Sequence, residues 1–247
     1  MKYKNILTKK YNNVMHIILN RKDKYNALNT ELTDELIDAL RESDKSELIK
    51  CIVISGVDDF SAGADINELA TNADFLTSWE LIDSIKKPLI AAVDGVAFGG
   101  GNELLLMCDI ILASKQAKFS QPEINLGLIC GGGGTQRLTT KIGKNWAMEM
   151  CLTGNIVTAE EAKNIGLVNH IYDASKLIKY ALDLANEISQ KPIEAIISTK
   201  KLIKDASKAH KDGLTAETAK FMQLLKTDNG IEGMNAFKEK RKPQFKN

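Results

Sequence analysis

Two glutamates of this chain stand where a carboxylate could do acid–base chemistry. Glu103 follows the run Gly99-Gly100-Gly101-Asn102 and precedes the apolar residues Leu104–Met107. A glutamate is almost never buried completely unless another group pairs with it or uses it. Glu123 comes directly after Pro122, farther along the same stretch. Two carboxyl groups held close together cannot both ionise easily, which suits one general acid and one general base.

Each glutamate also has an ordinary structural explanation. Acidic residues are common in the first turn of a helix, and proline favours the first helical position, so Glu123 alone predicts a helix start. The glycines before Glu103 and the apolar residues after it weigh against that explanation for Glu103. We favour catalysis for the pair because several further motifs converge on the groups that an active site needs.

The surrounding sequence predicts the strands and helices that would position this pair. Leu89–Val93 is an apolar run typical of a buried strand, and the triple glycine after it lets the backbone pass close to a ligand. Strands that alternate with helices favour a largely parallel sheet with right-handed crossovers, and from Ser175 to Lys242 the spacing is helical. The sequence therefore predicts an α/β core followed by a helical C-terminal part. Further strands are expected at 14–20, 49–55, 109–113 and 168–172. A helix is expected at about 29–42, and Thr158 with Glu161 predicts a capping box at the start of another helix.

The composition narrows the class of protein. The 247 residues are 44% hydrophobic and 26% charged, and the formal net charge is +1. These values are typical of a soluble globular protein, without the basic excess of a general nucleic-acid binder or an apolar run of about 18 residues that could cross a membrane. The N-terminal residues resemble neither a signal peptide nor a transit peptide, so we expect a cytoplasmic protein, or a mitochondrial matrix protein if a presequence has been removed. The scattered cysteines suit a reducing compartment and argue against a disulfide frame or a zinc site; they are Cys51, Cys108, Cys130 and Cys151.

Four motifs follow one another along the chain. The first is Phe60-Ser61-Ala62-Gly63-Ala64-Asp65-Ile66, and the second is Gly99-Gly100-Gly101-Asn102-Glu103. The third is Phe119-Ser120-Gln121-Pro122-Glu123, and the fourth runs from Gly131 to Arg137. Together and in this order they resemble the enoyl-CoA hydratase (crotonase) superfamily, and the resemblance covers essentially the whole chain.

This resemblance implies a fold and an activity. The implied fold is the α/β crotonase-like (ClpP/crotonase) spiral of ββα units with a helical C-terminal part. Residues 1–190 would form the core with the acyl-CoA site, and residues 191–247 a helical trimerisation region. The implied enzyme is an enoyl-CoA hydratase, a hydro-lyase of fatty-acid β-oxidation. It adds water reversibly and syn to trans-2-enoyl-CoA, giving 3-hydroxyacyl-CoA, and it would be a homotrimer or a homohexamer.

The resemblance also implies a role for each catalytic position. Negative charge builds on the thioester oxygen as water adds, and two backbone N–H donors would stabilise it. The matching donors of this oxyanion hole are Ala64 and Gly100, and Gly131 matches a glycine that positions the water. Glu103, near a helix N-terminus, is expected to be the better ionised glutamate and to activate the water, whereas Glu123 would deliver a proton to the α-carbon.

Coenzyme A contacts are implied in the same way. The enzyme would need no metal and no cofactor, because coenzyme A is part of the acyl-CoA substrate. Basic residues near the C-terminus could meet the phosphates of coenzyme A. The positions that match substrate and coenzyme A contacts are Lys24, Ala27, Ala62, Ala64, Asp65, Ile66, Asn67, Gly100, Phe221 and Lys240.

Two alternatives remain beside the hydratase. The first is an enoyl-CoA delta-isomerase or another acyl-CoA enzyme of the same fold; most isomerases keep only the acid that matches Glu123, so two glutamates favour the hydratase. The second is a non-catalytic or RNA-binding relative, against which the near-neutral charge weighs. The chain departs from the family pattern at Cys130, which stands where proline is usual, and at Asn125, which replaces an apolar residue. The passage 66–81, which shapes the acyl pocket, is several residues short, so the chain-length preference is open.

Overall fold

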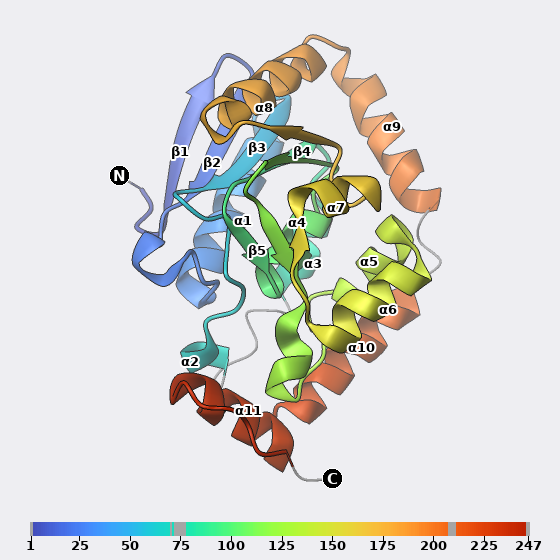
Figure 1. Ribbon diagram of the computed structural model, residues 1–247. Coiled ribbons are helices and arrows are strands. Elements are labelled where there is room, and N and C mark those ends of the chain that lie inside the picture. The colour runs from blue at the N-terminus through green and yellow to red at the C-terminus, as the bar shows by residue number, and fades with distance from the viewer. Residues whose placement is uncertain (1, 70, 72–77, 207–210, 246–247) are drawn as a thin grey trace.

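The fold is built on a six-stranded sheet. The computed structural model describes residues 2–69, 71, 78–206 and 211–245 (Figure 1). The strand order is β1–β2–β3–β4–β6–β9, in which β1 is antiparallel to β2 and every other pair is parallel. The bounds are Ile6–Tyr11 (β1), Val14–Leu19 (β2), Cys51–Gly56 (β3), Leu89–Val93 (β4), Ile110–Ser114 (β6) and His170–Tyr172 (β9).

A second, smaller sheet sets the positions of the two helices that carry Glu103 and Glu123. It contains β5 (Val96–Phe98), β7 (Lys118–Ser120) and β8 (Val157–Thr158). The chain alternates between the sheets: β4 and then β5 lead into helix α4, and β6 and then β7 lead into the short helix η3. These are the predicted ββα units. Because β5 and β7 are parallel neighbours, with Phe98 paired to Ser120, the helices that follow them begin side by side.

Helices cover both faces of the large sheet. Leu32, Leu36 and Leu40 of α1 pack into the main core, which also contains Ile52 and Ile54 of β3. Helix α8 covers the opposite face with apolar residues that meet β3, β4 and β6. The helices are η1 (Lys22–Lys24), α1 (Thr30–Lys45), α2 (Ile66–Leu69), α3 (Glu80–Asp83), α4 (Gly100–Leu106), η3 (Pro122–Leu126), α5 (Gly134–Ile142), α6 (Lys144–Thr153), α7 (Ala159–Asn164), α8 (Ala174–Ser189), α9 (Ile193–Ala206), α10 (Lys211–Leu224) and α11 (Asp228–Lys238).

The sequence predicted the buried elements better than the exposed ones. Strand β4 coincides with the predicted run, and the capping box at Thr158 is present. Helix α1 begins after Asn29, whose side chain accepts a hydrogen bond from the Leu32 amide at 3.0 Å, and it continues to Lys45, beyond the predicted end. Strand β1 was not predicted because it is an edge strand whose last residues are exposed. The strands of the small sheet were missed because two or three residues are too few to show a period.

The C-terminal helices return to the core. Helix α9 runs along the outside of the molecule, and α10 then lies against α5 (Figure 1). Helix α11 contacts η3, the helix of the second glutamate. The helical C-terminal part is therefore confirmed, whereas a domain boundary at residue 190 and a role in trimerisation stay predictions. Within the described ranges no helix is both long and apolar enough to span a membrane.

Candidate active site

The carboxyl group of Glu103 is bound by the turn that opens helix α5. Glu103 lies in the first turn of α4, and only 2% of the residue is exposed. Its Oε1 accepts hydrogen bonds from the backbone N–H groups of Gly132 at 2.8 Å and Gly134 at 2.7 Å. N–H groups at a helix start have no partner within the helix, and the positive end of the helix dipole lies there. Two helix starts, those of α4 and α5, therefore meet at Glu103.

Glu123 has one oriented oxygen and one free oxygen. It lies in η3, directly after β7. Its Oε1 accepts a long hydrogen bond of 3.4 Å from Nε2 of Gln121, whose Oε1 in turn accepts one of 2.6 Å from the side-chain amide of Asn102. Its Oε2 is buried and has no hydrogen-bond partner among the described residues. That oxygen is available to hold a proton or to meet a water molecule.

The two carboxyl groups lie close enough to influence each other. A carboxylate oxygen of Glu103, one of Glu123 and the Sγ of Cys130 all lie within 4.8 Å of one another. Burial, followed by the charges of Glu123 and Glu217, raises the pKa of Glu103 well above its ordinary value, while the two glycine amides oppose the rise. Burial raises the pKa of Glu123 to about 7. Both shifts favour a state in which the pair holds a proton over one in which both carboxyl groups are ionised.

This result changes the sequence-based view of Glu103. The sequence predicted that Glu103 is the better ionised of the two glutamates because it lies near a helix N-terminus. The amides of Gly132 and Gly134 do favour its charged form, but burial and the neighbouring carboxylates act more strongly in the opposite direction. The ionised state belongs to the pair, whose two members titrate together, rather than to Glu103 alone.

The same donor set could also hold a cation. Two carboxylates and a thiol, those of Glu103, Glu123 and Cys130, are donor types that zinc accepts. A cation there would occupy the oxygens of the acid–base pair. The sequence-based expectation of an enzyme without a metal stays a prediction.

The backbone amides of Ala64 and Gly100 lie next to each other. A Cβ atom added at Gly100 would lie 3.3 Å from the Ala64 nitrogen, and one added at Gly63 would lie 3.3 Å from the Gly100 nitrogen. Across the described part of the chain, neither amide donates a hydrogen bond. Two neighbouring unpaired N–H groups that point into the same space can both donate to one oxygen. The structure thus brings together the two amides that the sequence predicted for the oxyanion hole.

Trp79 borders this site, although the sequence indicated only a packing role. The residue is 4% exposed. Its ring lies 3.5 Å from the position of a Cβ at Gly100 and 2.8 Å from one at Gly132. The indole therefore lies against both Gly100 of the amide pair and the turn that binds the Glu103 carboxyl. No sequence signal marks this position, because Trp79 stands before a short helix and outside every motif.

Glu217 is a buried residue of the site that sequence reasoning missed. It lies in α10 and is 5% exposed. Its Oε1 accepts a hydrogen bond of 2.5 Å from the Gly133 amide, and its Oε2 accepts one of 2.7 Å from the Thr135 amide and another from the Thr135 hydroxyl. One signal could have found it: Glu217 lies four residues before Phe221, on the same face of a helix.

Phe221 packs directly on the glycine turn. The residue is 3% exposed, and its ring lies 2.6 Å from where a Cβ at Gly131 would stand. Thr218 donates a hydrogen bond of 3.2 Å from its hydroxyl to the Gly131 carbonyl. Helix α10 therefore covers this turn of its own chain. The water-positioning role expected of Gly131 stays a prediction.

Six of the residues expected to hold coenzyme A form one surface beside Ala64. The Ala62 amide donates to the Tyr25 carbonyl at 2.9 Å, which joins the turn of Lys24 and Ala27 to the loop before α2. Arg21 pairs with Asp65 at 2.8 Å. The side chains of Lys24, Ala62 and Asn67 are exposed, and those of Ala27, Asp65 and Ile66 are half-buried.

Lys240, another predicted contact, is exposed after the end of α11. Among the described residues, no hydrogen bond or ion pair joins it to the loop before α2. Of the passage 66–81, residues 70 and 72–77 lie outside the described residues, so the prediction about the acyl pocket is untested. Asn125 packs on Gly154 at the end of α6, where its Nδ2 lies 2.6 Å from the position of a Cβ.

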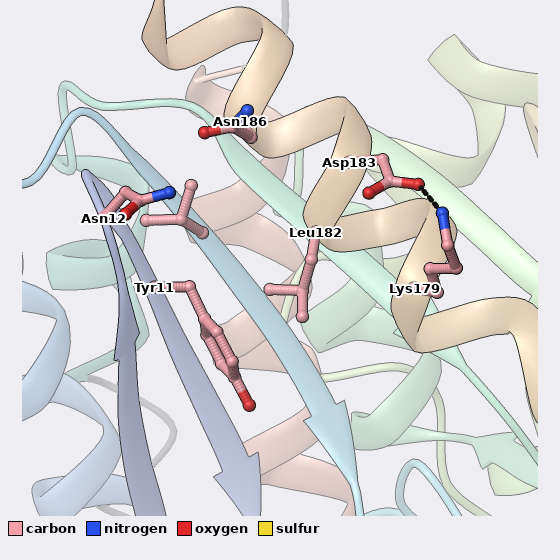
Figure 2. Close-up of a pocket in the computed structure, with 7 residues that line it drawn as sticks. Tyr11, Asn12, Lys179, Leu182, Asp183 and Asn186 are labelled. Atoms are coloured by element: carbon pink, nitrogen blue, oxygen red, sulfur yellow. Dashed lines mark hydrogen bonds and ion pairs between the residues drawn. The ribbon is translucent and has the colours of Figure 1, made fainter.

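Among the hollows on the surface of the described residues, two lie away from the acid–base pair. The one in Figure 2 lies between β1, β2 and α8 and has a volume of about 510 Å³. Its only drawn ion pair joins Lys179 to Asp183 at 2.5 Å. The second hollow, of about 690 Å³, lies between η3, α10 and α11. Neither is lined by the carboxyl pair or the amide pair, so we assign no chemistry to either hollow.

This fold and this site define an acid–base enzyme that acts on a carbonyl compound whose oxygen becomes negatively charged. The chain belongs to the enoyl-CoA hydratase/isomerase family, whose profile matches residues 9–247. It is 42% identical over 254 aligned residues to the probable enoyl-CoA hydratase echA8 of Mycobacterium leprae, with 99% of each chain covered. It is 43% identical to the mitochondrial enoyl-CoA hydratase of Pongo abelii, covering 96% of this chain and 85% of that one. The crystal structure of an enoyl-CoA hydratase/isomerase from Pseudoalteromonas atlantica T6c superposes with a TM-score of 0.92 at 29% identity, covering 98% of this chain and 100% of the other. The fold is thus the crotonase fold.

Proposed function

We propose that the protein is an enoyl-CoA hydratase, which reversibly adds water to trans-2-enoyl-CoA and forms 3-hydroxyacyl-CoA. Full-length similarity to proteins named enoyl-CoA hydratase supports this activity. The observation that carries it is the close pair Glu103 and Glu123, since adding water across a double bond needs both a base and an acid. The substrate fits fatty-acid β-oxidation.

The amides of Ala64 and Gly100 stabilise the negative charge that forms on the thioester oxygen. Both N–H groups lack a partner within the described residues and lie side by side, so they are oriented before the substrate arrives. Such preorganised donors contribute about 3–4 kcal/mol each to the transition state. The buried ring of Trp79 lies beside Gly100 and lines this side of the site.

Glu103 and Glu123 divide the proton transfers. Glu103 accepts a proton from water as the water oxygen bonds to the β-carbon, and Glu123 gives its own proton to the α-carbon. Afterwards Glu103 is protonated and Glu123 is ionised. Because their oxygens lie within 4.8 Å of each other, the proton can return to Glu123 and restore the starting state. Gly131 would position the attacking water in this scheme.

Coenzyme A enters as part of the substrate, and the reaction needs no separate cofactor. The surface beside Ala64 supports this assignment, because it offers backbone atoms and an exposed Lys24 to the coenzyme. We assign the contacts to Lys24, Ala27, Ala62, Ala64, Asp65, Ile66, Asn67, Gly100, Phe221 and Lys240.

We also propose a homotrimer or homohexamer in a reducing compartment, the cytoplasm or the mitochondrial matrix. Light scattering tests the assembly, and a monomer would contradict it. The four cysteines are free, which agrees with a reducing compartment.

Crotonyl-CoA hydration, followed as the loss of the enone absorbance, tests the activity. We expect turnover by the purified protein, and a series of enoyl-CoA chain lengths would then define the acyl preference. Absence of hydration together with isomerisation of 3-enoyl-CoA would instead identify an isomerase. A salt-dependent shift of RNA without any turnover would identify a binding protein.

A further inference from the structure

Cys130 and Cys151 face each other at the edge of the acid–base pair. Their Sγ atoms lie 3.8 Å apart. Cys130 precedes the glycine turn and is 2% exposed, whereas Cys151 lies in the last turns of α6 and is partly exposed. A disulfide has an S–S length of about 2.05 Å, so the sulfurs need to approach by roughly 1.8 Å. The other two cysteines, Cys51 and Cys108, are both buried and lie in the core.

We propose that Cys130 and Cys151 form an oxidisable dithiol, a covalent modification site whose disulfide form switches off the neighbouring acid–base pair. The formation of the bond is independent of the reaction assigned to the site, whereas its effect on activity rests on the proposed hydratase function.

A peroxide is the oxidant that fits the exposure of the two thiols. Hydrogen peroxide transfers an oxygen to the partly exposed Cys151 sulfur, which becomes a sulfenic acid, and one water leaves. The Cys130 sulfur then bonds to the Cys151 sulfur; the S–O bond breaks, and the hydroxyl leaves with the Cys130 thiol proton as a second water. Each sulfur has lost one electron, and both peroxide oxygens have been reduced to water.

The order of these steps follows from the surroundings of Cys130. Its hydrogen bond with Cys151, then burial, then the charges of Glu123 and Glu103 raise the pKa of the Cys130 thiol well above its ordinary value. Cys130 is only 2% exposed whereas Cys151 is partly exposed, so peroxide reaches Cys151 first. The Cys130 sulfur acts in the second step, because it lies 3.8 Å from the Cys151 sulfur and can condense with the sulfenic acid formed there.

Closing the bond would disturb the residues that orient the glutamates. Gln121 donates a hydrogen bond of 3.1 Å from Nε2 to the Cys130 sulfur, and the same Nε2 orients Glu123. Cys130 also packs on Gly134, where an added Cβ would lie 2.8 Å from its sulfur, and the Gly134 amide binds Glu103. Moving the Cys130 sulfur toward α6 therefore disturbs Gln121, which orients Glu123, and Gly134, whose amide binds Glu103.

The experiment treats the full-length protein with hydrogen peroxide, alkylates the remaining thiols, and maps the peptides by mass spectrometry. We expect a cross-linked peptide pair that joins Cys130 to Cys151 and has lost the two thiol hydrogens. Cys51 and Cys108 should be found alkylated. Crotonyl-CoA hydration should fall about 100-fold, as displacements near 1 Å in an active site can do, and dithiothreitol should restore it.

Cys151→Ser and Cys108→Ser are the matched variants. Cys151→Ser should keep the activity of the reduced protein, form no cross-link and resist peroxide, whereas Cys108→Ser should behave as the unmodified chain does. A Cys151 that becomes overoxidised without a cross-link would overturn the proposal, as would a cross-linked protein with full activity. If the reduced protein shows no hydration at all, the proposed function fails, while the cross-link still decides whether the dithiol exists.

Discussion

Glu103 and Glu217 bind alternate amides of the same turn. Glu103 accepts from the N–H groups of Gly132 and Gly134, and Glu217 accepts from those of Gly133 and Thr135. One carboxylate comes from α4 and the other from α10, which lie far apart in sequence. The free amides of a single helix start are therefore divided between a proposed catalytic residue and a residue of the C-terminal part.

This division makes α10 a support of the active site. Its Glu217 fixes the turn whose amides orient Glu103, and its Phe221 packs on Gly131 in the same turn. The charge of Glu217 also contributes to the raised pKa values of Glu103 and Glu123. A change in α10 should therefore be measurable as a change in acid–base chemistry.

Replacing Glu217 with glutamine tests this support. The glutamine places an NH₂ group against an amide donor, so we expect a loss of about 1–3 kcal/mol in unfolding free energy and a lower kcat. Removing the charge also lowers the pKa of the Glu103–Glu123 pair, so the acidic limb of the pH–rate profile should move to lower pH. A lower kcat with an unmoved acidic limb would leave Glu217 with a packing role only.

Replacing either catalytic glutamate with glutamine should abolish most of the hydration. Glu103→Gln removes the proton acceptor, and Glu123→Gln removes the proton donor. We expect each to lower kcat by about 10²–10⁴-fold while the variant still binds a CoA thioester, as measured by calorimetry. Glu149→Gln, an exposed glutamate on α6, is the control and should keep its rate. A near-normal rate in either active-site variant would refute the role of that glutamate.

The rate should depend on pH in a bell-shaped manner. Hydration needs one proton on the Glu103–Glu123 pair. Because the pKa of Glu123 is raised to about 7, the rate of the unmodified enzyme should fall as the pH rises through that value and the proton is lost. Initial rates of crotonyl-CoA hydration across a series of buffers measure this alkaline limb. A flat profile between neutral and alkaline pH would contradict a shared proton.

The carboxyl group of Glu123 should also make the unfolding free energy depend on pH. The pKa of Glu123 rises from 4.5 to about 7 on folding, so the folded state binds this proton more tightly than the unfolded state does. The stabilisation of the folded state by this proton is fully present below about pH 4.5 and is lost as the pH rises through about 7. A shift of this size corresponds to roughly 3 kcal/mol. Urea unfolding at about pH 5 and about pH 8 should show a larger decrease for the unmodified protein than for Glu123→Gln. Equal decreases would show that Glu123 does not titrate in this range.

Two glycine substitutions separate catalysis from packing. In Gly100→Ala the new Cβ lies 3.3 Å from the Ala64 nitrogen, where the thioester oxygen would bind. We expect kcat to fall about 10²–10³-fold with little change in melting temperature. In Gly131→Ala the Cβ would lie 2.6 Å from the Phe221 ring, so the protein should lose about 1–3 kcal/mol of stability in addition to any activity lost with the positioned water. An active, well-folded Gly100→Ala variant would argue against the oxyanion hole.

The sequence by itself determined the class of fold and the identity of the candidate groups. The apolar run Leu89–Val93 is buried throughout and therefore shows its pattern directly, and Glu103 stands out because an acid between glycines and apolar residues is unusual. The four ordered motifs were sufficient to indicate the family. These features are local in the chain, so they can be recognised without coordinates.

Only the tertiary structure decided how these groups act together. Glu103 and Glu123 meet because β5 and β7 are parallel neighbours in register, a pairing between strands too short to show a sequence pattern. Glu217 and Trp79 join them from segments that carry no motif. The ionisation of the pair was also beyond the sequence, since a pKa depends on burial and on charges that are near in space but distant along the chain.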